Sequence, residues 1–286
     1  MPSVQFRQES RATVRRRTGR LILRDRFAYG TVLAGATSTT FALESSKTKP
    51  DGHFVGQVAH IVSGTGAGQQ RVVTASTGST GVCTTTAWTT TPDVTSVVEI
   101  WSRMLAPDQV NDALNLALLG VHDVVNVRVD QTVVYATDLD ATRHTRFTLP
   151  STFIKVIDVL VKTTADMYTR YLPVEFGSQG RGHDFWFTVG PGRTVMLSHA
   201  PGSSDTILAR GYRLPAEMTA DADLCEVWPD YLVHQAGYLL EAADTGGTLI
   251  DPEQHAGRAA NWMREAMIRR SSIATIWEPY TQEVGI

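Results

Sequence analysis

Residues 107–119 read PDQVNDALNLALL, and this stretch carries a clear helical pattern. Proline at the first helical position, followed by Asp108, is typical of a helix start. Apolar residues then recur at three- and four-residue spacing on one face: Val110, Ala113, Leu114, Ala117, Leu118, Val121 and Val125. Leu116 and Leu119 fall outside this face. A helix that is apolar on more than one side needs more than one partner, from its own chain or from a neighbouring subunit.

Two further helices are predicted nearer the C-terminus. The first begins at Pro229, and its apolar face comprises Leu232, Ala236, Leu239, Leu240 and Ala243. The second has Asp251 as its N-cap, Pro252 at its first position and Gln254 three residues after the cap, which is a capping-box pattern. Its face contains alanines that permit close helix packing: Ala256, Ala259, Ala260, Met263 and Met267.

The segment between the helices has the pattern of a β layer. From Thr132 to about Tyr212 we predict strands at Val133–Tyr135, Arg146–Leu149, Lys155–Lys162, Asp184–Val189, Val195–Ser198 and Thr206–Tyr212. Pro-Gly pairs at 191–192 and 201–202 supply turns. The C-terminal tail, residues 276–286, lacks a helical period and carries Trp277 and Tyr280, so we expect it to dock on another surface.

Upstream of Pro107, residues 27–102 are rich in Thr, Ser, Gly and Val, which favours a small all-β module. Strands are predicted at Val58–Val62, Gln70–Thr74 and Val97–Trp101. The glycine-rich run at 64–68 could suggest a phosphate loop, but the residues after it favour a strand rather than a helix. We therefore predict a β-hairpin turn, in which glycine supplies positive φ angles.

The first 26 residues form a basic N-terminal arm, read either as a helix or as an extended arm ending in a strand-like run at Leu21–Leu23. This arm contains eight arginines and only two acidic residues, Glu9 and Asp25, whereas the whole chain carries a net charge of −3. Four of these arginines are candidate contacts to a portal protein or to DNA: Arg11, Arg15, Arg16 and Arg17. Phosphate contact, a salt-bridged acidic partner protein and a solvated arm all remain open.

The composition is that of an ordinary folded protein, with 42% hydrophobic and 19% charged residues over 286 positions. No run reaches the roughly 20 apolar residues of a membrane span, so no membrane partner is expected. The arginine-rich start lacks an apolar signal core, which predicts no export. Cys83 and Cys225 favour two buried free thiols, although a disulfide between them remains open.

Motifs for catalysis are missing. There is no G-x-S-x-G, and the histidines never form H-x-x-x-H or H-E-x-x-H. The carboxylate pairs Asp138/Asp140 and Asp221/Asp223 fall in predicted loops and lack the remaining ligands of a calcium loop. We predict no catalytic, cofactor-binding or metal-binding residues, and no enzyme activity.

Three segments together resemble known proteins of tailed bacteriophages. GTGAGQQRVV at 64–73, followed by Ala87-Trp88-Thr89 and then 92–100, resembles a small β module common in phage virion proteins. VNDALNLA at 110–117 is similar to the first core helix of head-to-tail connector (adaptor) proteins. The segments at 212–223 and 227–236, which run through a Leu-Pro turn and an acidic loop into a helix, resemble the later helical part of the same family.

The resemblance implies an α+β fold in which a helical bundle forms the adaptor-like core, with a β layer and an inserted small all-β module. The expected parts are the basic arm (1–26), the all-β module (27–102), the helical core with its β layer (103–275) and the docking tail (276–286). Helices with more than one apolar face suit a subunit packed between neighbours.

The function implied is that of a structural virion protein made in the host cytoplasm and located at the neck. It would form a ring of twelve copies between the portal and the stopper or tail proteins, with genomic DNA passing through. The basic arm, or the tail with Trp277 and Tyr280, would contact the portal. Another virion component carrying the same β module, such as a stopper, tail-tube or fibre protein, is the alternative, and an enzyme acting on nucleic acid or cell wall is a third hypothesis.

Overall fold

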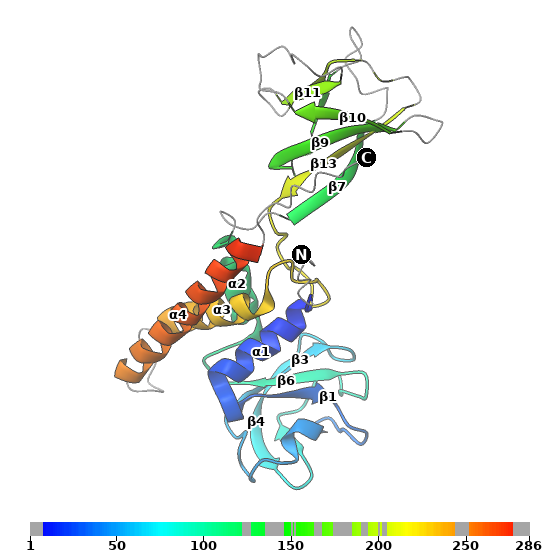
Figure 1. The fold of residues 1–286 in the computed structure, drawn as a ribbon. Coiled ribbons are helices and arrows are strands. Elements are labelled where there is room, and N and C mark those ends of the chain that lie inside the picture. Colours follow the sequence, from blue (N-terminus) through cyan, green and yellow to red (C-terminus); the bar gives the residue numbers. More distant parts are fainter. Residues whose placement is uncertain are drawn as a thin grey trace. The chain divides into compact units, whose positions relative to one another are not determined.

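The computed structural model describes residues 8–121, 127–134, 146–149, 151, 153–162, 168–173, 185–189, 194–199, 201, 205–243 and 252–276 (Figure 1). The chain divides into two compact units. Unit 1 contains Met1–Val121 and Glu217–Ile286, and unit 2 is the intervening segment His122–Ala216.

Unit 1 contains a six-stranded antiparallel sheet within its described residues. Its strands are β1 (Ala28–Thr31), β2 (Thr40–Ala42), β3 (Val58–Ser63), β4 (Gln70–Thr77), β5 (Val82–Thr85) and β6 (Val97–Trp101). Their order across the sheet is β1-β6-β3-β4-β5-β2, so the first strand pairs with the last. The three strands predicted by name in this region are confirmed. Phe41, Phe54 and Ile61 are among the residues that fill its core.

The glycine-rich run at 64–68 is a turn between β3 and β4, as predicted. Gly64, Gly66 and Gly68 all have φ between 80° and 88°, in the left-handed region that favours glycine. A Cβ on Gly64 would lie 2.0 Å from the carbonyl oxygen of Thr95, so the close approach of these backbones also requires glycine.

Four α-helices are present in the described part of the chain. They are α1 (Arg11–Leu23), α2 (Pro107–Leu119), α3 (Pro229–Ala243) and α4 (Pro252–Ile276), with short 3₁₀ turns at Arg24–Arg26 and Glu44–Ser46. The predicted helix starts at the three prolines are confirmed. The strand-like reading of Leu21–Leu23 is wrong, because these residues complete α1. Ser10 caps this helix by accepting a hydrogen bond from the Thr13 amide.

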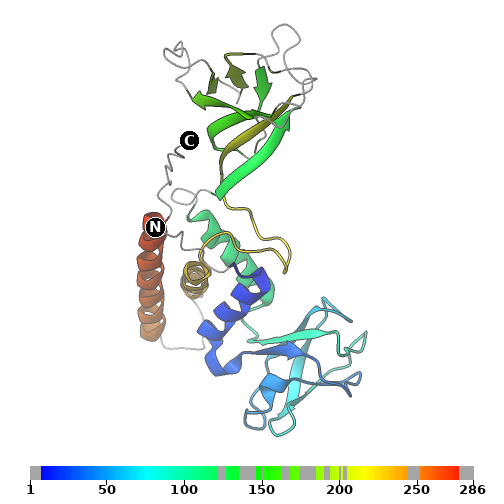
Figure 2. The same cartoon turned by 45° about the vertical axis from the view of Figure 1, so that its right-hand side comes forward.

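Helix α3 lies at the centre of the helices of unit 1 and separates α2 from α4 (Figure 2). On one side the Tyr231 hydroxyl donates to the Ala117 carbonyl of α2. On the other side the absence of a side chain at Gly237 leaves room for close packing, since a Cβ there would come within 3.1 Å of Trp262 on α4. The same Cβ would lie 3.4 Å from Leu21 on α1.

The predicted apolar faces of the helices have different outcomes. On α2, the face through Val110, Leu114 and Leu118 is buried, as predicted. On α4, the packed side carries Ala266, whereas Met263 and Met267 of the predicted face are exposed. The buried side of α4 predicted from its alanines is therefore wrong.

Unit 2 contains a seven-stranded sheet within its described residues. Its strands are β7 (Val127–Val134), β8 (Arg146–Thr148), β9 (Lys155–Lys162), β10 (Tyr168–Pro173), β11 (Trp186–Val189), β12 (Thr194–Leu197) and β13 (Thr206–Arg213). The order is β7-β13-β9-β10-β11-β12-β8, and β10 and β11 pair in parallel while the other neighbours are antiparallel. The core of the sheet includes Phe147, Phe153, Val159, Phe187 and Ile207. The strand β10 was not among the predicted strands, and β7 begins six residues before the predicted Val133.

The predicted fold class, a helical-bundle core with added β-structure, is wrong. The protein is a mixed α+β protein dominated by two curled sheets, and its four described helices do not form a helical-bundle core (Figure 1). Helical periods are visible within one window of sequence, whereas sheets depend on pairing between distant segments. β1 with β6 and β7 with β13 are such pairs. Short strands such as β2 and β8 give little periodic signal on their own.

Candidate functional site

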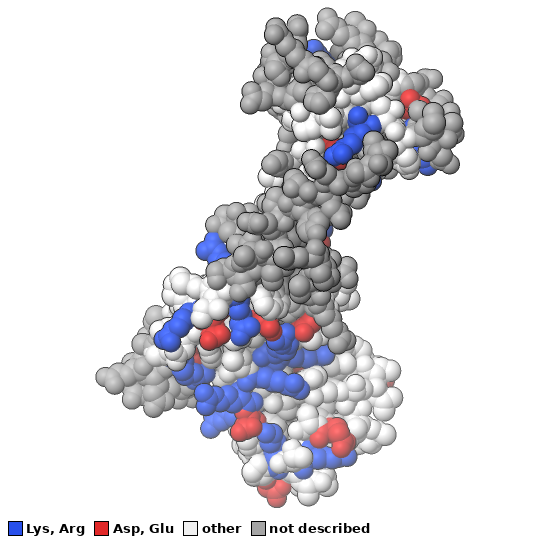
Figure 3. All heavy atoms as spheres, viewed as in Figure 1, with Lys and Arg blue, Asp and Glu red and all other residues white. Residues whose placement is uncertain are grey.

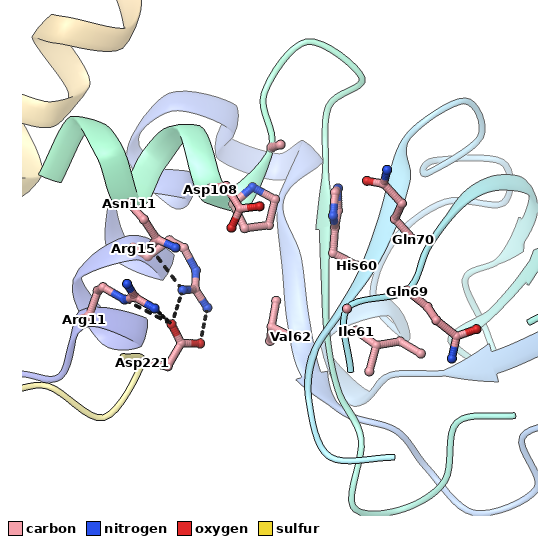
Figure 4. Close-up of a pocket in the computed structure, with 13 residues that line it drawn as sticks. Arg11, Arg15, His60, Ile61, Val62, Gln69, Gln70, Asp108, Asn111 and Asp221 are labelled. Atoms are coloured by element: carbon pink, nitrogen blue, oxygen red, sulfur yellow. Dashed lines mark hydrogen bonds and ion pairs between the residues drawn. The ribbon is translucent and has the colours of Figure 1, made fainter. Parts of the chain in front are cut away.

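The arginine-rich start of the chain becomes an ordered helix whose first half is joined to carboxylates. Arg15 is the central residue, with a side chain that is 2% exposed. Its guanidinium donates to both oxygens of Glu99 on β6, at 3.1 and 2.9 Å, and to both oxygens of Asp221, at 2.6 and 2.9 Å. It also donates to the Asn111 amide oxygen on α2 (Figure 4). Arg15 therefore connects four segments of unit 1.

Glu99 is fully buried and is satisfied by donors from two elements. Besides Arg15, it accepts from Arg16 Nε at 2.9 Å and from the Trp101 indole N–H at 3.1 Å. Glycine at position 19 lets α1 pack closely against Trp101 of β6, because a Cβ there would lie 2.6 Å from the Trp101 ring. A buried carboxylate needs such compensation, since an unpaired buried charge is strongly destabilising.

Asp221 lies in the segment before α3 and pairs with two arginines. Arg11 donates to it through Nε and Nη2, and also donates to the Met218 carbonyl. Partial burial acts to raise the pKa of Asp221, but the hydrogen bonds and charges of Arg15 and Arg11 outweigh it and hold the pKa at about 2. Burial acts to lower the pKa of Arg15, and its bonds to Asp221 and Glu99 raise it instead. Both groups are therefore charged at neutral pH.

Arg17 belongs to a second ion-pair cluster that joins three helices. It donates to Glu9 at 2.9 Å and to Asp230 in the first turn of α3. Asp230 also accepts from Arg269 of α4 at 3.4 Å. Near the other end of α3, Arg258 of α4 forms a 3.0 Å ion pair with Glu241, which is almost completely buried. These pairs hold α1, α3 and α4 together.

The four candidate arginines thus already have partners within unit 1. Arg16 and Arg17 keep partly exposed side chains, whereas Arg15 is buried. Their role in contacting a portal or DNA stays a prediction. Trp277 and Tyr280, the candidate contacts in the tail, lie outside the described residues.

Sequence reasoning missed the carboxylates that neutralise this helix. Glu99 lies 84 positions after Arg15, and Asp221 lies 206 positions after it. The only available signal was the lone Glu99 in the apolar strand Val97–Trp101, because a charge inside a buried strand requires a partner.

The other arginines of the same run are placed differently. Arg20, Arg24 and Arg26 are exposed, and within the described residues none of them forms an ion pair with a carboxylate. Arg20 instead donates to the Tyr29 hydroxyl. The guanidinium groups of Arg16 and Arg20 both lie over the Tyr29 ring. Lys and Arg side chains gather over the α1 side of unit 1 in Figure 3.

Arg15 and the side chains around it, Arg11, Arg16, Glu99, Asn111 and Asp221, form the Arg15 cluster. A polar cavity of about 490 Å³ adjoins this cluster (Figure 4). It is lined by Arg11, His60 of β3, Asp108 at the start of α2, and Asp221, among others. Burial lowers the pKa of His60, although Asp108 and Glu99 act in the opposite direction. The guanidinium groups of Arg11 and Arg15 at this cavity are bound to Asp221, and among the described residues no serine or cysteine lines it. The arginines of the cavity are therefore already paired with a carboxylate of the same chain.

The two cysteines are free and buried, as the sequence favoured. Burial raises the pKa of both the Cys83 and the Cys225 thiols to about 12, so neither is a reactive thiolate at neutral pH. Among the described residues, no group of three or more His, Cys, Asp or Glu side chains could hold a metal ion. None of the described helices is long and apolar enough to cross a membrane.

The profile of the SU10 adaptor protein family matches residues 80–278. The chain belongs to this family of phage head-to-tail adaptors. The match covers β5, β6, α2, the sheet of unit 2, α3 and α4, while α1 and β1–β4 precede it. None of the curated proteins compared with the chain matches it.

Proposed function

We propose that the chain is the head-to-tail adaptor of its phage, forming a ring of twelve copies at the neck of the virion. The portal protein lies on one side of this ring and stopper or tail proteins on the other, and genomic DNA passes through the centre. The observation that carries the proposal is the adaptor-family match over residues 80–278. We further propose that the protein has a structural role and is not an enzyme.

The two ion-pair clusters of unit 1 support a structural role for the protein. The Arg15 cluster joins α1, α2 and β6 to the segment before α3, and the Arg17 cluster joins α1 to α3 and α4. Buried, multiply hydrogen-bonded ion pairs favour one defined arrangement of the joined elements, because each group left unpaired would be costly. A ring subunit that transmits contacts between portal and tail needs such fixed geometry.

The portal contact is proposed to involve the partly exposed Arg16 and Arg17, or the tail residues Trp277 and Tyr280. Arg11 and Arg15 would support that surface through their ion pairs instead of reaching the partner directly. An acidic portal surface would compete with Glu9 and Asp230 for Arg17.

The test is co-assembly of the purified full-length chain with the portal protein of its own phage. Size-exclusion chromatography with light scattering should give a complex containing twelve copies of the chain per portal ring. Truncation before Trp277, and separately the change Arg17→Gln, should identify which segment contributes to binding. Absence of any complex, with the chain found away from the neck in particles, would contradict the proposal and favour a stopper, tail-tube or fibre role.

A further inference from the structure

Helix α2 presents an exposed strip that the described residues of its own unit do not cover. Leu116 and Leu119 are 54% and 59% exposed, on a helix whose opposite face is buried. Asp108 and Asp112 are also exposed and lie on the same side, because the positions 108, 112, 116 and 119 follow the spacing of one helix face. The α2 strip, Asp108-Asp112-Leu116-Leu119, is therefore acidic at its start and apolar at its end.

Helix α4 presents a second exposed strip of opposite charge. Met263, Met267 and Ile268 are 37%, 55% and 53% exposed. Arg264 lies among them and is exposed, and its one hydrogen bond within the described residues goes to Asn261, three positions earlier. The α4 strip, Met263-Arg264-Met267-Ile268, is therefore apolar with a positive charge.

The two strips cannot pair within one copy. Helix α3 separates α2 from α4, packing against α2 through Tyr231 and against α4 through Gly237 (Figure 2). A contact between two different surfaces of identical chains is heterologous, and repetition of such a contact closes a ring when the rotation permits. A symmetric contact of either strip with itself would instead oppose like charges.

We propose that the α2 strip of one copy packs against the α4 strip of the next copy, with Asp112 paired to Arg264 and the leucines packed against the methionines. This inference rests on the proposed ring, and it identifies the surfaces that close it. Methionine side chains adapt readily to an opposing apolar surface, which suits an interface formed only on assembly. Interface cores of this kind are apolar with charged groups at the rim.

The experiment is disulfide cross-linking of full-length chains assembled with the portal protein. The native thiols do not interfere, because Cys83 and Cys225 are buried and their pKa values of about 12 keep them protonated. A chain carrying both Leu119→Cys and Met267→Cys should give a ladder of multimers on a non-reducing gel. Equal mixing of the two single variants should stop at dimers, and each single variant alone should stay monomeric.

A matched control uses Val94, which is 57% exposed on the loop before β6 and belongs to neither strip. The pair Val94→Cys and Met267→Cys should give less than about one tenth of the cross-linking. Charge reversal adds a second readout: Asp112→Arg and Arg264→Asp should each reduce ring formation, and the double variant should restore it.

The outcomes separate the interface from the ring. Rings seen by negative-stain imaging without the specific cross-links, or dimers from a single-cysteine chain, would overturn this interface and leave the proposed adaptor role standing. Failure of the unaltered chain to form any ring with the portal protein would overturn both.

Discussion

The two halves of the N-terminal arginine run look alike in sequence and differ in structure. Arg11, Arg15, Arg16 and Arg17 are bound by carboxylates from the rest of unit 1, whereas Arg20, Arg24 and Arg26 are exposed without a carboxylate partner among the described residues. The first set is held by ion pairs within unit 1, although Arg16 and Arg17 keep partly exposed side chains, whereas the second set has no such pairs in the described chain. Charge density along a sequence therefore does not reveal which charges are available to a partner.

The largest effect is expected from Glu99→Gln. This change removes the charge of the fully buried carboxylate that binds both Arg15 and Arg16. Breaking a buried ion pair from one side costs about 3–5 kcal/mol, so the midpoint of thermal unfolding should fall by many degrees. The control is Glu44→Gln, whose side chain is largely exposed and pairs only with Lys47 in the described chain. A loss below about 1 kcal/mol for both variants would show that the Arg15 cluster does not hold the fold together.

A smaller effect is expected from Asp221→Asn. The asparagine keeps the shape but loses the charge that pairs with Arg11 and Arg15. Because the Asp221 side chain is one-third exposed, water can compensate part of the loss, and we expect about 1–2 kcal/mol in urea unfolding. A destabilisation equal to that of Glu99→Gln would indicate that both carboxylates are required as one unit.

Acid should weaken the same cluster in a defined pH window. The pKa of Asp221 is about 2 in the folded chain against an ordinary 3.8, so its stabilisation is complete above about pH 4. It is lost as the pH falls from about 4 to 2, with an upper bound of about 2 kcal/mol that solvent screening reduces. Asp221→Asn should flatten this part of the curve of unfolding free energy against pH, and an unchanged slope would contradict the assignment.

The smallest effect on stability is expected from the combined changes Arg24→Gln and Arg26→Gln. Both side chains are exposed, so the unfolding free energy should stay within about 0.5 kcal/mol. Binding to an anionic partner should weaken, and the slope of log affinity against log salt should fall by about one for each phosphate that the variant no longer neutralises. Unchanged affinity together with an unchanged salt slope would show that these exposed arginines contact no anionic partner.

The helices were the predictable part of this fold. Proline at the first position located the starts of α2, α3 and α4, and the apolar period gave the buried face of α2. The buried side of α4 was not predictable in the same way, because Trp262 and Ala266 pack against a neighbour that the sequence of one helix does not specify. Met263 and Met267 are apolar and were therefore predicted to be buried, but α4 packs against α3 through a different side.

The sheets and the ion-pair clusters were harder to predict from the sequence. Strand β10 has no strict alternation, and its neighbours β9 and β11 pair with it in opposite senses. The candidate arginines were identified from their density, but their carboxylate partners are contributed by distant segments. Only tertiary structure brings Glu99 and Asp221 together around Arg15.

The central claim is that copies of this chain form the adaptor ring of the neck. A density map of the neck in intact particles tests it most directly. We expect twelve copies of the chain between portal and tail, with α2 of each copy against α4 of the next. Density for the chain at the distal end of the tail, or in fibres, would contradict this claim.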